Sequence, residues 1–177
     1  MSERLDDTRL PGRRTFLKTS AAVVSGMALT GPLAAQERKA AAMPSIQLGP
    51  HRISRLVAGW NPVGGHSHST SNLSRCMLEY FTVENTAEFL LRCEREGITA
   101  WQYDHTDKSV AALRLAREKG CQMKVICLHA ERRIDAPIKK VIDDTRPIAI
   151  VHHGGVTDAL FRGGQHAKVR DFVKKVK

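Results

Sequence analysis

The segment ITAWQYDHTDKSVAALRLAREKGCQMKVICLH, residues 98–129, decides the fold that the sequence predicts. It begins with a short apolar run, ITAWQYD (98–104), and ends with a second one, QMKVICLH (122–129), and both are typical of buried strands. Between them, KSVAALRLAREKG (108–120) has the apolar spacing of an amphipathic helix and stops at a glycine. A strand, a helix and a strand at this spacing predict a parallel βα unit.

The same alternation continues on both sides of this segment. Upstream, SIQLGPHRIS predicts a small hairpin that turns at Gly49-Pro50, and SRLVAGW (54–60) predicts a buried strand followed by a polar loop. A helix is then expected from Thr82, its N-cap, to a stop at Gly97. Downstream, the pattern predicts a helix over 136–145, a strand over 148–153 and a final helix over 164–177. The expected fold is therefore α/β, with four parallel βα units.

Residues 1–42 differ in composition from the rest of the chain. They contain RRTFLK, starting at Arg13, and then a short apolar stretch from Ala21 to Leu29. This segment resembles a twin-arginine export signal, which implies recognition by the twin-arginine translocation machinery, cleavage and delivery to the periplasm. A basic amphipathic helix or a single membrane anchor is the alternative. The apolar stretch is shorter than the roughly 20 residues of a spanning helix, so no stable membrane span is expected after cleavage.

The net charge and its distribution bear on whether the chain binds nucleic acid. The net charge is +10, and it falls to +7 without residues 1–42, which carry seven Lys or Arg and four Asp or Glu. The basic residues form neither a recognition motif nor a patch interleaved with aromatic side chains, so a nucleic-acid partner is not expected.

The cysteines at 76, 93, 121 and 127 form no C-x-x-C pair. We expect buried free thiols rather than a zinc cluster.

Histidines gather where the predicted strands end. Six of the eight histidines fall there, and the other two are His51 in the hairpin and His166 near the last helix. Since parallel βα units bind ligands at the carboxyl ends of their strands, we expect a functional pocket at this edge. The alternative is that polar residues simply accumulate where strands leave the core. The polar residues at the four strand ends are Asn61, His66, Ser67 and His68; Gln102, Tyr103, Asp104 and His105; His129 and Glu131; and His152 and His153.

The last predicted strand, in RPIAIVHHGGV (146–156), ends in two adjacent histidines. Neighbouring residues of a strand point to opposite faces, so only one of these imidazoles can point toward the ligand. We predict that it is His153, because Gly154 and Gly155 leave the adjacent backbone uncovered. His152 is expected to pack against helices or to support the pocket.

Three stretches resemble the aldo/keto reductases: IQLGPHRISRLVAGWNPVGG, LLRCEREGITAWQYD and IAIVHHGG, within residues 45–160. The resemblance implies the N-terminal half of a (βα)8 TIM-type barrel over residues 43–177, and NADPH as cofactor. Four units instead of eight imply either a truncated product or a homodimer that closes the sheet. The family uses an aspartate, a tyrosine, a lysine and a histidine. At these positions the chain has Gln102, no tyrosine, His129 or Leu128, and His153 (less well His152).

Our first functional hypothesis is an exported oxidoreductase of aldo/keto reductase type with a degenerate catalytic set. Its substrate would be a small carbonyl or sugar-like molecule. His153 would hydrogen-bond the reacting oxygen, and His129 would replace the missing acid, because imidazole titrates near neutral pH. Gln102 and Asp104 would complete the catalytic groups. The substrate would be bound by Asn61, His68 and His152.

Two alternatives remain open. The first is a metal-dependent hydrolase, lyase or isomerase on the same frame, with Glu131 as general base. Its ligands to zinc, manganese or iron would be His68, Asp104, His129 and His153. The second is a barrel that binds a ligand without catalysis, which the loss of three of the four family residues favours.

Overall fold

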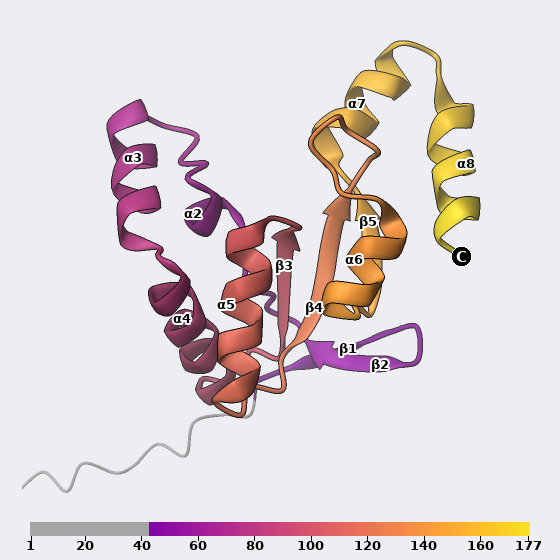
Figure 1. The fold of residues 1–177 in the computed structure, drawn as a ribbon. Helices are drawn as coiled ribbons and strands as arrows, with labels where there is room; N and C mark the ends of the chain where they lie inside the picture. The colour runs from indigo at the N-terminus through magenta and orange to yellow at the C-terminus, as the bar shows by residue number, and fades with distance from the viewer. Residues whose placement is uncertain (1–42) are drawn as a thin grey trace, which may run out of the picture. The chain divides into compact units, whose positions relative to one another are not determined.

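Residues 43–177 are the part of the chain that the computed structural model describes, and they alternate strands with helices (Figure 1). The predicted export leader, residues 1–42, lies outside the described residues. Within the described part, no helix combines the length and apolar character that crossing a membrane requires. The strands are β1 (Ser45–Leu48), β2 (His51–Ser54), β3 (Ala100–Asp104), β4 (Lys124–His129) and β5 (Ala149–His152). The helices are α2 (Asn61–Gly64), α3 (Ser71–Tyr80), α4 (Val83–Arg95), α5 (Asp107–Glu118), α6 (Ile138–Thr145), α7 (Gly154–Arg162) and α8 (His166–Val176).

The centre of the fold is a parallel three-stranded sheet in the order β3–β4–β5, which confirms a mixed α/β class. The predicted strand over 54–60 is wrong in extent, because it reduces to one bridge between Ala58 and Trp101. The Ala58 N–H donates to Ala100 O (3.0 Å), and the Gln102 N–H donates to Ala58 O (2.8 Å). Trp60 and the Asn61-Pro62 pair then start α2, which ends the extended backbone. Within residues 43–177 the sheet does not close into a barrel.

Local sequence signals fix the two helices around β3. Thr82 caps α4 as predicted, since its side chain accepts a hydrogen bond from the Asn85 N–H (3.2 Å). Thr106 and Ser109 form a capping box at the start of α5. Each helix is followed by a glycine with positive φ, Gly97 at +83° and Gly120 at +95°, as an αL stop requires. The predicted hairpin is also present, with β1 antiparallel to β2.

The two faces of the sheet have different coverings. The outer face carries Trp101, Tyr103 and Cys127, which are fully buried in a core shared with α4 and α5. The inner face carries Ala100 and Ile126, and Ile53 of the hairpin covers it at the amino ends of the strands. Cys93, Cys121 and Cys127 are buried free thiols, as predicted, whereas Cys76 is exposed, against the prediction.

Two helices lie where the sequence analysis expected loops. α3 starts at the N-cap Thr70, whose side chain accepts from the Leu73 N–H (3.2 Å), and it has no buried residue. Apolar residues recur at i, i+3, i+4 and i+7 from Leu73, so the sequence does carry a helical signal here, which was overlooked after the polar stretch 66–72. α7 begins at Gly154 and Gly155, which were expected to form an uncovered turn.

Candidate functional site

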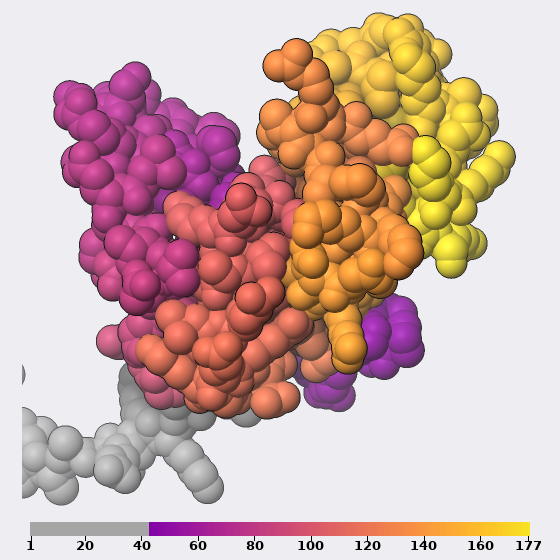
Figure 2. Space-filling view, viewed as in Figure 1, coloured from indigo at the N-terminus to yellow at the C-terminus, as the bar shows by residue number. Residues whose placement is uncertain are grey.

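A pocket of about 410 Å³ lies at the carboxyl ends of the strands, on the inner face. We call it the strand-end pocket. Figure 2 shows the surface hollowed between the purple α2–α3 segment and the orange loop that follows β4. The strand alternation explains which residues reach it, since Asp104 and Leu128 are paired neighbours that point inward together. The pocket lining includes Trp60, Asn61, His68, Asp104, Arg132 and His153.

His153 lies in this pocket, as the alternation in β5 predicts. Its backbone N–H donates to His129 O (2.9 Å), and its carbonyl accepts the N–H groups of Val156 and Thr157 as the N-cap of α7. Its side chain makes no capping bond. The ring atom Nδ1 is buried and has no hydrogen-bond partner among the described residues. Such a buried polar atom is rare and costly unless a further group satisfies it.

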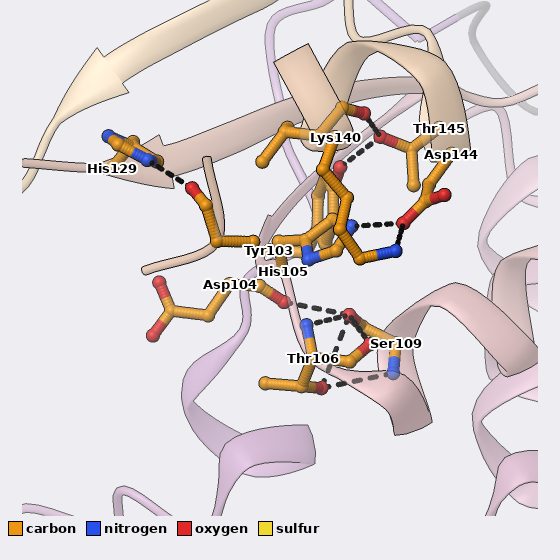
Figure 3. Close-up of polar contacts among 11 residues, drawn as sticks. Tyr103, Asp104, His105, Thr106, Ser109, His129, Lys140, Asp144 and Thr145 are labelled. Carbon is orange, nitrogen blue, oxygen red and sulfur yellow. Dashed lines mark hydrogen bonds and ion pairs between the residues drawn. The ribbon is translucent and has the colours of Figure 1, made fainter. Parts of the chain in front are cut away.

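His129 does not line this pocket, so the expectation that His129 and His153 belong to one shared pocket is wrong. The residue of β4 that points into the pocket is Leu128, and His129 is paired with His152 on the outer face. The His129 ring stacks on Phe172 of α8 at 5.7 Å between centroids. Its Nε2–H donates to Ala136 O (2.9 Å), as Figure 3 shows, and its Nδ1 accepts the Glu131 N–H (3.2 Å). Both ring nitrogens are therefore occupied within the fold.

Three other residues proposed for the site also lie outside the pocket lining. His152 points outward, where its ring meets Phe172 edge-on at 4.9 Å and its Nδ1–H donates to Thr157 Oγ1 (2.7 Å). Burial lowers the pKa of His152, and the positive charges that His153 and His129 can carry lower it further. Gln102 shares the inward face with Asp104 but does not line the pocket. Glu131, with φ at +53°, pairs with Lys175 at 2.5 Å instead of facing a ligand.

Asp104 is joined to the loop after β4 by Arg132, a residue that the sequence analysis missed. Arg132 Nη2 donates to Asp104 Oδ1 (3.0 Å), and its Nε donates to Asp135 Oδ1 (2.9 Å). Asp135 Oδ2 in turn accepts the N–H groups of Ala130 (2.9 Å) and Arg132 (2.8 Å). Burial opposes both charges, but these hydrogen bonds outweigh it, so the pKa of Arg132 is raised and that of Asp135 is lowered.

Asn61 and His68 form the opposite wall of the pocket. The Asn61 side-chain amide donates from Nδ2 to His68 Nε2 (2.9 Å), which assigns the proton of the neutral ring to Nδ1. His68 has φ at +55°, in the left-handed region that non-glycine residues seldom adopt. These two predicted residues are thus brought together with Asp104 and His153. Trp60 adds an apolar wall, 6.1 Å from Trp101 between ring centroids.

A separate polar network lies on the outer face (Figure 3). His105 Nε2 pairs with Asp144 Oδ2 (2.9 Å), and Lys140 Nζ reaches the same oxygen (2.8 Å). The Tyr103 hydroxyl is buried against Thr145 Oγ1 (2.5 Å), and burial raises the pKa of this tyrosine. Figure 3 shows the carboxylate of Asp104 pointing away from this network. Neither His105 nor Tyr103 is therefore available to a ligand in the strand-end pocket.

The residues present do not fit the metal hypothesis. Within residues 43–177, no three His, Cys, Asp or Glu side chains are grouped closely enough to hold a metal ion. Of the four predicted ligands, His129 lies on the far face of the sheet from His68, Asp104 and His153. We therefore derive no step through a divalent metal.

The pocket also does not fit the phosphates of NADPH. Arg132 is the single lysine or arginine that lines it in the described part of the chain, and two carboxylates already bind this guanidinium. A diphosphate is normally held by cationic groups or helix N–H groups that are free to receive it. Comparisons with protein families, with curated proteins and with solved structures gave no match to this chain.

Proposed function

We propose that residues 43–177 form a binding module for a small polar organic molecule, which occupies the strand-end pocket and hydrogen-bonds to His153. The observation that carries this proposal is the buried Nδ1 of His153, which has no partner among the described residues. A rotation of the His153 ring would bring Nδ1 from its buried position beside Gly155 into the pocket that the residue lines. A ligand hydroxyl or carbonyl there would satisfy this atom and recover the free energy that its burial costs.

The other walls support the same ligand chemistry. Asp104 and Asn61 offer carboxylate and amide oxygens that accept hydrogen bonds, and Trp60 offers an apolar surface. A few polar groups in a concave, partly apolar site are the usual composition of a small-molecule site. The volume of about 410 Å³ falls within the range of such pockets.

We propose that the sheet is one half of a (βα)8 arrangement, as the resemblance to aldo/keto reductases implies. This is supported by the parallel order from Ala58 through β3, β4 and β5, and by the hairpin under the inner face. Ligands of that fold bind at the carboxyl ends of the strands, where the pocket lies.

Reduction of a carbonyl compound is a second candidate function. It is favoured by one observation, the position of His153 in the pocket at the end of β5, where the resemblance implies a catalytic histidine. No tyrosine or lysine lines the pocket among the described residues. NADPH, the hydride donor, would have to bind outside the strand-end pocket, and His153 would have to supply both the hydrogen bond and the proton by itself. Binding without turnover is therefore the first candidate.

A panel of small hydroxyl and carbonyl compounds, added to the isotopically labelled full-length chain and followed by amide NMR shifts, tests the first proposal. D-xylose, D-glucose and glyceraldehyde are suitable probes. His153→Ala should weaken binding at least about tenfold, equivalent to ~1.4 kcal/mol. The control His152→Ala removes the neighbouring imidazole on the other face and should leave the affinity within about twofold.

Two results would contradict the proposal: no probe binds the wild-type chain, or His153→Ala binds as tightly as wild type. The second candidate is separated by NADPH consumption in the presence of glyceraldehyde. Turnover that His153→Ala abolishes would favour reduction, whereas binding without NADPH consumption would favour the module.

A further inference from the structure

We infer that the strand-end pocket takes a hydroxyl-rich ligand and excludes anions, and that Asp104 is the residue responsible for this exclusion because it occupies Arg132. This inference rests on the proposed binding function and names the chemical class of its ligand. The charged side chains beside the pocket, and the pairing of their atoms with one another, support it.

Arg132 would by itself make the pocket an anion site. Its guanidinium presents five N–H donors in a geometry that matches a carboxylate, and its side chain is 19% exposed. Asp104 and Asp135 compensate this charge before a ligand arrives, with contacts of 3.0 and 2.7 Å from Arg132 Nη2. Two carboxylates against one guanidinium leave a net negative charge beside the pocket.

Asp135 and Asp104 differ in which of their oxygens are already hydrogen-bonded within the fold. Asp135 is 5% exposed, and its oxygens are taken up by Arg132 and by two backbone N–H groups of its own loop, so it fixes the loop. Asp104 lines the pocket and binds Arg132 through Oδ1 only. Within residues 43–177 its Oδ2 accepts no hydrogen bond. That oxygen is available to a ligand, and it accepts O–H donors and repels a carboxylate.

The remaining polar groups favour hydroxyl groups over an anionic group. The Asn61 amide is held by His68 through its nitrogen, which leaves its oxygen as an acceptor. His153 Nδ1 needs one donor or acceptor, and a hydroxyl can be either. The net negative charge of Asp104, Asp135 and Arg132 together disfavours an anion and does not disfavour a cation. The group set therefore matches several hydroxyls spaced along one small molecule without an anionic group.

Three sugars with the same ring test the inference: D-glucose is neutral, D-glucuronate is an anion and D-glucosamine is a cation at neutral pH. Their dissociation constants are measured by amide shifts on the full-length chain. Wild type should bind glucose at least about tenfold more tightly than glucuronate, and it should bind glucosamine at least as tightly as glucose because the charge beside the pocket is negative. Asp104→Asn removes the repulsion and frees Arg132, so it should reduce the ratio of glucose to glucuronate affinity at least about tenfold.

Two further variants serve as controls for Asp104→Asn. Asp143→Asn makes the same charge change at an exposed residue paired with Lys139, away from the pocket, and should leave the ratio unchanged. Asp104→Glu keeps the charge and should keep the preference for glucose over glucuronate. Should Asp104→Asn fail to fold, the wild-type ratio and Asp104→Glu still decide.

The outcomes separate this inference from the function on which it rests. If wild type binds glucuronate as tightly as glucose or more tightly, or binds glucosamine as weakly as glucuronate, the inference is overturned but the binding function still stands. An unchanged ratio in folded Asp104→Asn overturns the role of Asp104. If no probe binds wild type at millimolar concentration, the binding function itself falls, and the inference falls with it.

Discussion

Arg132 and Asp104 join two strand ends across the inner face of the sheet. The guanidinium comes from the loop after β4, and its Nη2 donates to Asp104 Oδ1 at the end of β3 over 3.0 Å. Because the same guanidinium binds Asp135 in its own loop, this contact couples the loop conformation to the wall of the strand-end pocket.

Replacing Arg132 with methionine should lower the free energy of unfolding by about 2 kcal/mol or more. The reason is that the 5% exposed carboxylate of Asp135 would keep its charge without its cation. Urea denaturation measures the change. Lys139→Met is the control, because its pair with Asp143 is exposed to solvent and should contribute little to the free energy of unfolding. Equal losses for the two variants would show that Arg132 does not hold the loop.

Tyr103→Phe should separate the tyrosine of β3 from any chemistry in the pocket. The hydroxyl donates to Thr145 Oγ1 on the outer face, and the Thr145 hydroxyl donates onward to Val141 O. Its removal should cost about 1 kcal/mol of unfolding free energy and leave ligand affinity unchanged. Affinity and denaturation are measured on the same preparation. A loss of affinity greater than about tenfold would place Tyr103 in the binding machinery, against its position here.

Lys108→Met should loosen the wall that carries Trp60. Lys108 Nζ donates to the carbonyls of Val63 (2.6 Å) and Phe81 (3.2 Å), and it lies 5.9 Å from the Trp60 ring centroid. Burial lowers the pKa of this lysine. We expect a loss of about 1.5 kcal/mol and a shift in tryptophan fluorescence, since two carbonyls lose a charged donor.

The control for Lys108 is Lys119→Met, at an exposed position after α5. It should change stability by less than about 0.5 kcal/mol and leave the fluorescence unchanged. A Lys108→Met chain with wild-type stability and fluorescence would contradict the structural role of the lysine.

Stability should fall as the pH is lowered through the range in which His152 titrates. Burial, followed by His153 and His129, lowers the pKa of His152 from its ordinary 6.5, so the unfolded chain binds the proton more readily than the folded one. The stabilisation by the neutral ring is therefore complete above pH 6.5 and is lost as the pH falls toward the lowered pKa.

Urea denaturation over a pH series measures this dependence. His152→Gln should flatten the slope of unfolding free energy against pH below 6.5. His166→Gln, at an exposed residue of α8, should keep the wild-type slope. A wild-type slope in His152→Gln would mean that another group controls the dependence.

The elements that the sequence predicted well are those with a complete local signal. Helices α4 and α5 have caps, an apolar stripe and a glycine stop, and strands β3 and β4 are short apolar runs between them. The missed helix α3 has a cap at Thr70 and apolar residues at helical spacing from Leu73, but it follows a polar stretch of serine, histidine and threonine that predicted a loop. The start of α7 was obscured by Gly154 and Gly155, which are weak helix formers.

The candidate site was predicted where the alternation of strand residues was applied and missed where it was not. In β5 the alternation separates His153 from His152, and the structure places them on opposite faces. The same rule in β4 assigns the inward position to Leu128 and turns His129 outward. Arg132 was missed because its role depends on two carboxylates that only the folded loop brings together.

The most direct test of the account is a side-chain NMR titration of the full-length chain with D-glucose, in which the imidazole ¹⁵N signals are assigned by single substitutions. The account predicts a saturable shift at Nδ1 of His153 and at the Asn61 amide, with His129 unchanged, because the His129 nitrogens are already bonded within the fold. A titration that moves His129 and leaves His153 in place, or that moves neither, would contradict the central claim that the strand-end pocket is a binding site.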